Sequence, residues 1–277
     1  MSIITLTTDF GLKDHAVASV KGAILNILPQ AQIIDISHLI APFNIIEAAY
    51  ITRNAYKSFP KGSIHIIGVD AEYTPENKHI ALELDDHYFI GADNGIMSLV
   101  AGHIKPKQIV EIDIHQSVQT SFTLLDVFVY VATHLAKGGK LDVIGRKIDQ
   151  IKQLKYIQPI TNDQKNQITG HVIYIDNFGN LVTNVTRQLF DSLQNDRKFT
   201  ITARNIKFNR LYNSYSDAID FTKKPEERQS KGKKIALFNS ADFIELSLYK
   251  SNPQISGGAS SLFGLELMDT INIKFHE

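Results

Sequence analysis

Two carboxylates lie five residues apart near the start of the chain, at Asp9 and Asp14 on either side of Gly11. The apolar run 3–6 stops just before them, and a stretch with helical spacing, 17–28, begins just after. Open α/β sheets bind ligands where a strand ends in a turn before a helix. Paired carboxylates at such a place suit ribose hydroxyls or a cation. The alternative is that they only cap the turn and the helix.

Further carboxylates follow other strand-like segments. Asp70 comes directly after the apolar run 63–69, and Asp93 follows the run 88–92 and precedes Asn94. A carboxylate at the end of a strand in an α/β sheet is more often functional than one on a helix face. Each of these residues could instead be a simple turn former or helix cap.

The second half of the chain has its own polar cluster, in residues 175–184. It places Asp176, Phe178 and Asn180 together with a glycine and two further asparagines, after an apolar strand. An Asn side chain offers both a donor and an acceptor, which suits the edge of adenine, and a carboxylate suits an ammonium group. The alternative is a turn between two strands, since these are turn-forming residues.

Residues 1–150 alternate strand-like and helix-like segments. The predicted strands are 3–8, 32–36, 63–69, 79–84, 88–92 and 108–114, and the predicted helices are 17–28, 46–59 and 125–136. The pair 79–84 and 88–92 has the pattern of a hairpin across Asp85 and Asp86. The alternation predicts an N-terminal α/β domain with a largely parallel central sheet.

The composition then changes. Residues 151–167 are polar and form the predicted linker, and residues 168–277 are dominated by short β-like segments. These segments are 170–175, 198–203, 234–238, 243–248 and 270–275, with one helix at 187–193. This half is predicted to be a smaller C-terminal antiparallel β-barrel domain. The long polar stretch 209–233 is either a flexible loop or an excursion that contacts a partner.

Composition excludes several classes of function. The 277 residues carry 29 Lys and Arg against 29 Asp and Glu, so the formal net charge is zero. The charge therefore gives no reason to expect binding to nucleic acid or to an anionic membrane. There is no cysteine, and no apolar run approaches the ~18–20 residues of a membrane span. No signal peptide is evident, so a cytoplasmic location is expected. The histidines lack metal-ligand spacing, and no metal is expected. Dinucleotide and nucleoside-triphosphate loop motifs are absent.

Taken together, these motifs resemble the S-adenosyl-L-methionine hydroxide adenosyltransferase family, which is related to fluorinating and chlorinating enzymes. The resemblance rests on Thr8-Asp9-Phe10-Gly11 with Asp14, Lys21-Gly22, Asp35-Ile36-Ser37-His38, Pro42-Phe43, Val69-Asp70, Asp93-Asn94-Gly95, Asp176-Asn177-Phe178-Gly179-Asn180, Thr183-Asn184 and Asn239-Ser240. It implies an N-terminal α/β domain, a C-terminal β-barrel and a homotrimer. It also implies that substrate binds between subunits.

The resemblance also implies roles for single residues. Asp14 would hold both ribose hydroxyls, Asp9 would support its turn, and Phe43 would lie beside the ribose. The roles implied for the second half are contacts of Asp176 and Ser240 with the methionine amino and carboxylate groups, of Asn180 with the adenine edge, and of the Ala259 backbone with adenine. Phe178, Asp93 and Asn94 are expected to line the same substrate site.

The chain departs from the family at the catalytic positions. Hydrolases of this family use an Asp-Arg-His set to position and polarise water. Asp70 matches the Asp, but Asn77, beside Lys78, stands at the Arg position, and Thr123 stands at the His position. The serine that binds halide in the fluorinating relatives would fall at Leu124, which does not support halide chemistry.

The resulting hypothesis is that water attacks C5′ of S-adenosyl-L-methionine and gives adenosine and L-methionine, without a cofactor. Asp70 would orient the water, and Lys78 or His79 would reach in from the same loop. Nucleic acid and membranes are not expected partners. The alternative hypothesis is a non-catalytic or near-inactive member that binds adenosine or S-adenosyl-L-methionine as a trimer.

Overall fold

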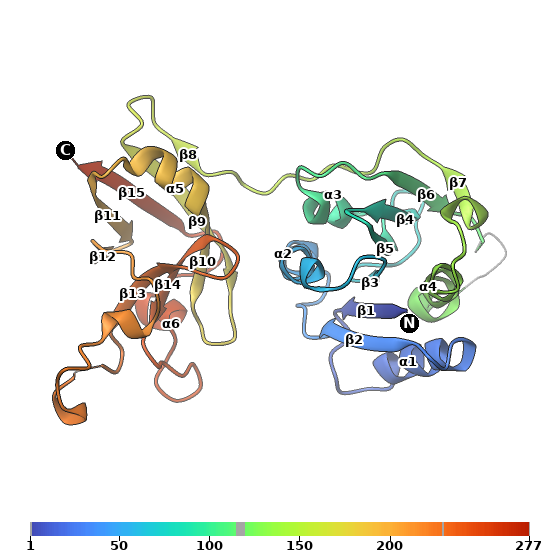
Figure 1. The fold of residues 1–277 in the computed structure, drawn as a ribbon, viewed down its shortest axis with the longest axis horizontal. Coiled ribbons are helices and arrows are strands. Elements are labelled where there is room, and N and C mark those ends of the chain that lie inside the picture. The colour runs from blue at the N-terminus through green and yellow to red at the C-terminus, as the bar shows by residue number, and fades with distance from the viewer. Residues whose placement is uncertain (1, 115–119, 229, 277) are drawn as a thin grey trace. The chain divides into compact units, whose positions relative to one another are not determined.

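A computed structural model of the chain describes residues 2–114, 120–228 and 230–276 (Figure 1). They form two compact units, of which the first ends at Tyr156 and the second begins at Ile157. The boundary falls inside the segment 151–167, the predicted linker. In the described part of the chain, no helix is long and apolar enough to cross a membrane.

The first unit is built on a mixed seven-stranded sheet. Its strands are β1 (Ile3–Thr8), β2 (Gln32–Ser37), β3 (Ile64–Gly68), β4 (His79–Leu84), β5 (His87–Ala92), β6 (Gln108–Ile112) and β7 (Gly145–Lys147). They lie in the order β2-β1-β3-β5-β4-β6-β7. The first four in this order are parallel, and β4, β6 and β7 add an antiparallel edge. The predicted α/β class is confirmed.

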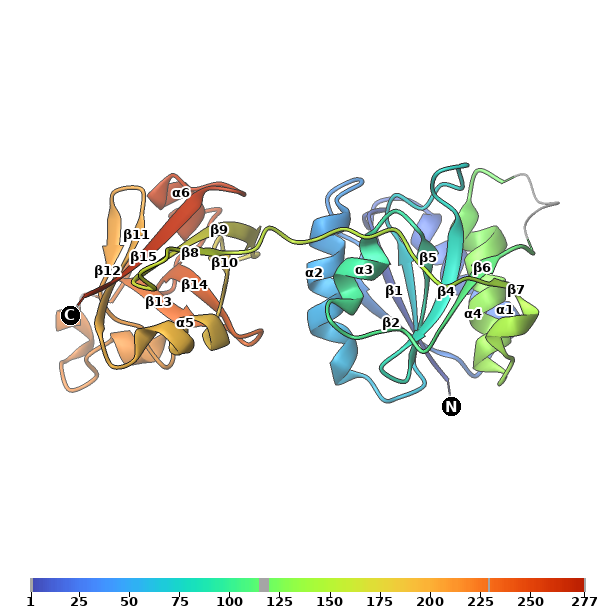
Figure 2. The same cartoon turned by 90° about the horizontal axis from the view of Figure 1, so that it is seen from above.

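Helices cover both faces of this sheet (Figure 2). They are α1 (Ala16–Ile27), α2 (Ile45–Ala55), α3 (Ile96–Ala101) and α4 (Val129–Ala136). Helices α1 and α4, with a π-helical turn at Leu124–Phe128, pack on one face, and α2 and α3 pack on the other. Strand β3 is buried along its whole length because both faces are covered.

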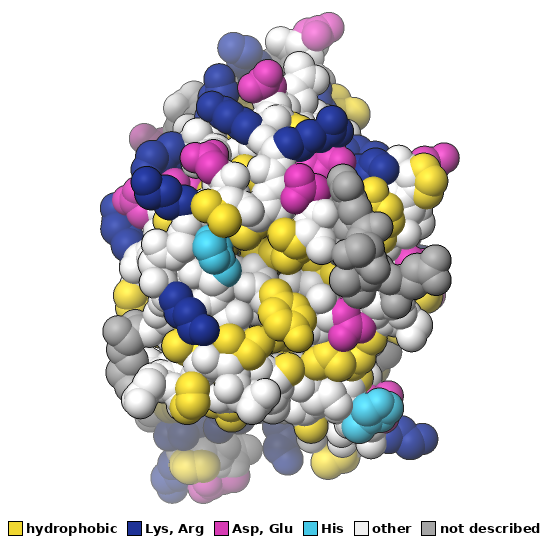
Figure 3. Space-filling view, turned by 90° about the vertical axis from the view of Figure 1, so that its right-hand side faces the viewer, with side chains coloured by type: hydrophobic (Ala, Val, Ile, Leu, Met, Phe, Trp, Pro, Cys, Tyr) yellow, Lys and Arg dark blue, Asp and Glu magenta, His cyan; other side chains and the backbone are white. Residues whose placement is uncertain are grey.

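The layer of α1 and α4 also carries hydrophobic side chains on its outer side. Figure 3 shows this face of the first unit, with hydrophobic side chains gathered near its centre and charged side chains mainly above them. Leu25 of α1 and Tyr130 of α4 are among the exposed large hydrophobic residues. These two helices therefore keep some apolar surface exposed on the side away from the sheet.

Local sequence explains where several elements begin and turn. Helix α2 begins after Asn44, whose side chain accepts a hydrogen bond from the Glu47 backbone at 3.1 Å. The predicted helix 46–59 ends earlier, at Ala55, and a 3₁₀ turn follows it. The predicted hairpin of β4 and β5 is confirmed. Asp85 and Asp86 both have positive φ, as a tight hairpin turn requires. Helix α3 was not predicted.

The second unit is a nearly closed antiparallel sheet, as predicted. Its strands are β8 (Ile160–Thr161), β9 (Gln167–Ile175), β10 (Leu181–Thr186), β11 (Lys198–Ala203), β12 (Ile206–Phe208), β13 (Lys234–Phe238), β14 (Phe243–Leu248) and β15 (Thr270–His276). The main order is β12-β11-β15-β9-β10-β14-β13, and β8 pairs with β9. A bridge from Tyr212 to Leu237 brings the two ends of this order together. Besides the predicted helix, now α5 (Arg187–Gln194), there is a short α6 (Ala259–Phe263).

The polar stretch 209–233 is an excursion whose first part folds back onto the barrel. Ala218 and Ile219 are buried, and they pack with Ile235 and Leu237 of β13 in a small apolar cluster. This cluster covers the outer face of β13 and β14. The main barrel core, which includes Ile244 and Leu246, lies on the opposite face of the same strands.

Candidate functional site

Four parallel strands of the first unit end at the same edge of the sheet. Because β2, β1, β3 and β5 are neighbours and run in parallel, the loops that follow them lie side by side. These loops carry Asp9 and Asp14, Phe43, Asp70, and Asp93 with Asn94. The structure therefore brings to one edge the first-unit residues predicted to bind substrate, together with Asp70, which is predicted to orient the water.

The loops after β1 and β2 are tied together by hydrogen bonds. Asp9 Oδ2 accepts from the backbone N–H of Phe43 at 2.9 Å, and the Gly11 N–H donates to the His38 carbonyl at 2.7 Å. Phe43 has φ 62°, a left-handed conformation that is uncommon for a non-glycine residue. Its side chain is 73% exposed. Asp9 therefore holds a strained turn that presents an aromatic ring to solvent.

Asp14 lies at the exposed end of the loop after β1. Its Oδ1 accepts a hydrogen bond from the backbone N–H of Ala16 at 2.9 Å, at the start of α1. The other carboxylate oxygen makes no hydrogen bond with the described residues. Asp14 therefore bonds to the first backbone N–H of α1 from the position before the N-cap residue, His15, and still has a free oxygen to offer to a ligand hydroxyl.

Asp70 is held by its backbone rather than by its carboxylate. Its φ is 48°, and the Asn94 side-chain amide donates to the carbonyls of Val69 and Asp70 at 3.2 and 3.0 Å. Asn94 is itself buried, and its Oδ1 accepts from the Ile96 N–H. In the described part of the chain, the Asp70 carboxylate has no hydrogen-bond donor. The fold thus fixes Asp70 in place and leaves its carboxylate available.

Thr123 reaches the same edge from the segment before α4. The ring of Phe122 packs edge-on against Phe10, with centroids 5.7 Å apart, which ties this segment to the loop after β1. The next side chain, Leu124, is buried so tightly against Gly68 that a Cβ there would collide with it. The position of the halide-binding serine is therefore a packed core position in this chain.

Asn77 and Lys78 are engaged within and beside their own loop. Asn77 Oδ1 accepts from Lys152 Nζ at 2.9 Å, and Lys78 Nζ donates to the Tyr73 hydroxyl at 3.0 Å. His79 is buried, with Nε2 3.0 Å from the Ala71 carbonyl. Among the described residues, none of these three side chains forms a hydrogen bond with the Asp70 carboxylate.

Asp93 anchors the end of the first unit. Its Oδ1 accepts from the Lys152 backbone N–H at 2.8 Å. Burial raises the pKa of the Asp93 carboxyl, and the hydrogen bond from Lys152 only partly opposes this. Leu154, two residues further along, packs on Gly95. Asp93 therefore fastens the segment that leads out of the unit, next to Asn94.

In the second unit, Asp176 organises the turn between β9 and β10. Its Oδ1 accepts from the backbone N–H groups of Phe178 and Asn180, each at 2.8 Å, and its Oδ2 accepts from the Asn180 side-chain amide at 2.9 Å. Asn180 is buried, whereas Phe178 is 62% exposed. The backbone is therefore a turn between two strands, as the alternative interpretation holds. The same hydrogen bonds keep Asp176, Phe178 and Asn180 close together.

The start of α6 packs directly on this turn. The Ser260 N–H donates to the Gly179 carbonyl at 2.9 Å, and the backbones of Gly179 and Gly258 approach so closely that a Cβ on either would clash. Ala259, which follows Gly258, is fully buried. Ser240 lies exposed in the turn between β13 and β14. Asp176, Phe178, Asn180 and Ala259 are thus brought together, whereas Ser240 forms no hydrogen bond with them in the described part of the chain.

Two residues near this turn were missed by the sequence analysis. Glu245 of β14 is 3% exposed, and its carboxylate accepts from the Tyr215 hydroxyl at 2.7 Å. Burial raises the pKa of the Glu245 carboxyl, the nearby charge of Asp176 adds to this, and hydrogen bonds from Tyr215 and Asn239 oppose it. Glu245 could have been found from the sequence, because it is a single charged residue inside the apolar strand 243–248. Nothing in the sequence indicated Tyr215, because it lies in the polar excursion 209–233.

The fold and these residues define a two-unit protein, with a carboxylate-lined α/β sheet edge followed by an antiparallel barrel. The chain belongs to the SAM hydroxide adenosyltransferase family: the N-terminal domain of that family matches residues 4–145 and the C-terminal domain matches residues 170–272.

Individual relatives agree with this assignment. The chain is 32% identical to an (R)-S-adenosyl-L-methionine hydrolase of Methanocaldococcus jannaschii, over 99% of this chain and 96% of that protein. It is 23% identical to a fluorinase of Nocardia brasiliensis, over 69% of this chain and 73% of that protein. A crystal structure of an uncharacterized conserved protein from Thermotoga maritima superimposes with a TM-score of 0.82, at 28% identity, over 99% of this chain and 100% of that one.

Proposed function

We propose that this protein hydrolyses S-adenosyl-L-methionine at C5′, giving adenosine and L-methionine. The observation that carries the proposal is Asp70. It lies at the carboxyl edge of the sheet, its backbone is clamped by Asn94, and its carboxylate is not engaged by another described residue. The name of the full-length relative, an (R)-S-adenosyl-L-methionine hydrolase, supports the same reaction.

The proposed step is a single displacement. The oxygen of a water molecule bonds to C5′ while the C5′–S bond breaks, and its electron pair stays on sulfur. Because the sulfonium leaves as a neutral thioether, the leaving group needs no acid. The protonated alcohol formed at C5′ then releases its extra proton to bulk water, so that the products are adenosine, methionine and one proton. The protein must hold the sugar still and align the water behind C5′. Asp70 would accept a hydrogen bond from this water and so orient it.

The other residues would bind the substrate. Asp14 has a free carboxylate oxygen for the ribose hydroxyls, and Asp9, which bonds to the Phe43 backbone, would hold that ring beside the sugar. Asn94 and Asp93 would act indirectly, by fixing Asp70 and the adjoining segment. The second-unit contacts that we propose are Asp176 and Ser240 for the amino acid, and Phe178, Asn180 and the Ala259 backbone for adenine.

We further propose that the active form is a homotrimer with its sites between subunits. The exposed side chains around both groups of residues support this. Leu12, Leu39 and Phe43 in the first unit, and Phe178 in the second, are large hydrophobic residues that stay exposed in the single chain. A trimer would cover them, and each interface should bury more than about 1,200 Å². Light scattering that finds a monomer at concentrations where ligand binds would contradict the trimer.

Slow turnover, or binding without turnover, is the second candidate. The observation in its favour is that Asn77 and Lys78, at and beside the family Arg position, bond to Lys152 and Tyr73 rather than to Asp70. Loss of one preorganised electrostatic group costs about 2.7–4 kcal/mol of transition-state stabilisation in other enzymes.

The test is to incubate pure protein with S-adenosyl-L-methionine and to follow adenosine and methionine by chromatography. Equal amounts of the two products, absent with Asp70→Asn, support hydrolysis. Binding of S-adenosyl-L-methionine by calorimetry without either product favours the second candidate. Neither binding nor product would contradict both.

A further inference from the structure

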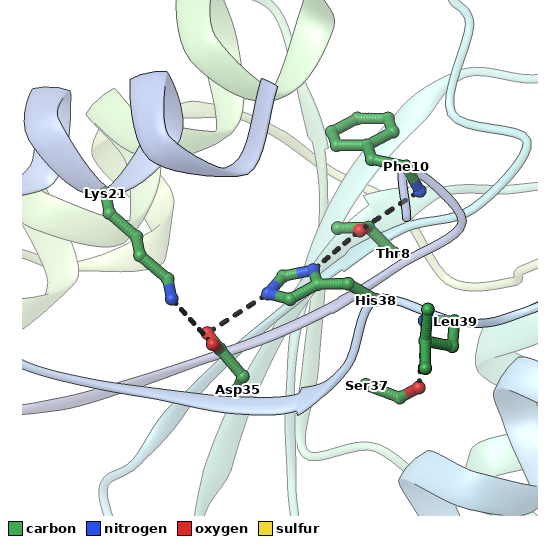
Figure 4. A network of polar contacts seen from close by, with 7 residues as sticks. All are labelled: Thr8, Phe10, Lys21, Asp35, Ser37, His38 and Leu39. Atoms are coloured by element: carbon green, nitrogen blue, oxygen red, sulfur yellow. Dashed lines mark hydrogen bonds and ion pairs between the residues drawn. The ribbon is translucent and has the colours of Figure 1, made fainter. Parts of the chain in front are cut away.

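A chain of four polar side chains leads to Thr8, at the end of the strand β1 that precedes the loop with Asp14 (Figure 4). Lys21 of α1 donates to Asp35 Oδ2 at 2.6 Å, and Asp35 Oδ1 lies 3.1 Å from His38 Nε2. His38 Nδ1 lies 2.8 Å from the Thr8 hydroxyl, at the end of β1. The chain thus connects α1, β2 and β1 just before the carboxyl edge of the sheet.

The hydrogen bonds at the Thr8 end of this chain can run in one direction. The Phe10 backbone N–H donates to Thr8 Oγ1 over a long 3.4 Å, so the Thr8 hydroxyl is free to give its own proton to His38 Nδ1. With its proton on Nε2, the neutral tautomer of His38 then faces Asp35 Oδ1 across 3.1 Å, an electrostatic contact that lacks the geometry of a hydrogen bond. We assign this tautomer from the network. Burial alone would raise the pKa of the Asp35 carboxyl, but the hydrogen bond from Lys21 and the close approach of His38 hold it below its usual value.

The same histidine also holds the loop by its backbone. The His38 carbonyl accepts from the Gly11 N–H at 2.7 Å, in the middle of the loop between Asp9 and Asp14. Gly11 has φ 70°, so the loop turns sharply at this bond. His38 is 4% exposed and Thr8 is 1% exposed. Neither side chain can touch a ligand at the surface, and both fix the base of the loop that does.

We propose that Thr8, His38, Asp35 and Lys21 form a positioning network that sets the place of Asp14, and so gives the site its selectivity for a ribose over a 2′-deoxyribose. The inference rests on the proposed role of Asp14 in the function above. Asp14 is exposed, and its one hydrogen bond with a described residue, from the Ala16 N–H, is local. The loop beneath must therefore supply the accuracy with which its free oxygen meets a hydroxyl.

The experiment compares the affinities of adenosine and 2′-deoxyadenosine by calorimetry. For the unaltered protein we expect adenosine to bind at least about tenfold more tightly, since a hydroxyl bonded to a charged group is lost in the analogue. Asp14→Asn should bring the ratio of the two affinities close to one. Thr8→Val keeps the shape of the side chain and removes the hydroxyl. It should lower the ratio of the two affinities about as much as Asp14→Asn does.

Two matched variants separate positioning from general loss of stability. Thr8→Ser keeps the hydroxyl and should keep the ratio within about twofold of the unaltered protein. Thr133→Val removes another buried hydroxyl, which bonds to the Val129 carbonyl within α4, and should leave the ratio unchanged. Should Thr8→Val not fold, Lys21→Met at the more exposed end of the network gives the same comparison.

The outcomes distinguish this inference from the proposed function. If Asp14→Asn loses the selectivity but Thr8→Val and Lys21→Met keep it, the network does not position Asp14 and the inference is wrong. If Asp14→Asn keeps the selectivity, or the unaltered protein has none, then Asp14 does not read the ribose, and the inference fails with that assignment. Formation of adenosine from S-adenosyl-L-methionine in the same samples would show that the proposed reaction stands regardless.

Discussion

The Asp9 carboxylate and the Phe43 backbone N–H are joined by a hydrogen bond of 2.9 Å across 34 residues of sequence. The two residues follow neighbouring parallel strands, so the bond makes one structural unit of two loops. It also pins Phe43 in a left-handed conformation that costs free energy. Any ligand that contacts the Phe43 ring therefore depends on Asp9 without touching it.

Removing this bond should weaken nucleoside binding. Asp9→Ala should reduce the affinity for adenosine by about 1 kcal/mol, or roughly fivefold, because Phe43 is then free to relax. Asp9→Asn keeps an acceptor at the same place and should lose less. Calorimetry with adenosine measures both. An Asp9→Ala protein that binds as tightly as the original would show that the Phe43 turn does not contribute to the site.

Restoring the family pattern at the catalytic positions should raise turnover. Asn77→Arg and Thr123→His reintroduce the two ionisable groups, and the double variant should gain more than the sum of the single variants, since residues that act as one unit are non-additive. The rate of adenosine formation at saturating substrate measures this. The unaltered protein should also lack the pH dependence that a catalytic histidine imposes near neutrality.

The obstacle to that gain is visible in the structure. Asn77 bonds to Lys152, and Thr123 is buried directly before Leu124, so each new side chain must find room toward Asp70. A double variant that binds substrate normally and gains no rate would contradict the account. The account would also be wrong if the unaltered protein already hydrolysed S-adenosyl-L-methionine as fast as family members that have the Arg and the His.

The fold followed from the sequence where one pattern decides the outcome. The buried run of β3, the end of α1 at Ile27 shortly before Pro29, and the Asp85-Asp86 hairpin are all set by local chemistry. Helix α3 was missed because it has only six residues, all buried, and shows no polar face. The excursion 209–233 was left open because its few apolar residues, such as Ala218 and Ile219, pack only once β13 and β14 have formed.

The site divides in the same way. Strand order brings Asp9, Asp14 and Asp70 to one edge, and the sequence indicates each of them as a carboxylate at a strand end. What each side chain bonds to could not be predicted, because the partners are distant in sequence. Asp93 accepts a hydrogen bond from the Lys152 backbone, 59 residues away, and Glu245 accepts one from the Tyr215 hydroxyl, 30 residues away.

Acid should destabilise the protein through a buried histidine. His65 bonds to Thr5 and to His87 inside the first unit, and burial lowers its pKa from 6.5 to about 3. The unfolded chain therefore binds the proton first. The stability that neutral His65 contributes is complete above about pH 6.5 and is lost as the pH falls toward 3, by about 1.4 kcal/mol per pH unit within that window.

Denaturant unfolding between pH 7 and 4 checks this. His65→Gln should flatten the dependence of the unfolding free energy on pH, and His103→Gln, at an exposed histidine, should leave it unchanged. Equal pH dependence in the original protein and in His65→Gln would show that the histidine is not held neutral by the fold.

Glu245 should affect stability in the opposite sense. Its folded pKa is raised above the usual 4.5, so the stability that the protonated form contributes is complete below 4.5 and is lost as the pH rises. Glu245→Gln keeps an oxygen for Tyr215 without the charge. It should stabilise the protein at pH 7 by about 1–2 kcal/mol, with no gain at pH 4. Thermal unfolding measures this, with the exposed Glu226→Gln as control, and a loss of stability at pH 7 would contradict it.

The central claim is that water, oriented by Asp70, attacks C5′. The most direct measurement is to run the reaction in water enriched in oxygen-18 and to analyse the adenosine by mass spectrometry. We predict that adenosine carries one heavy oxygen at its 5′ position and that methionine carries none. Adenosine without the label, or cleavage of S-adenosyl-L-methionine to a product other than adenosine and methionine, would contradict the account.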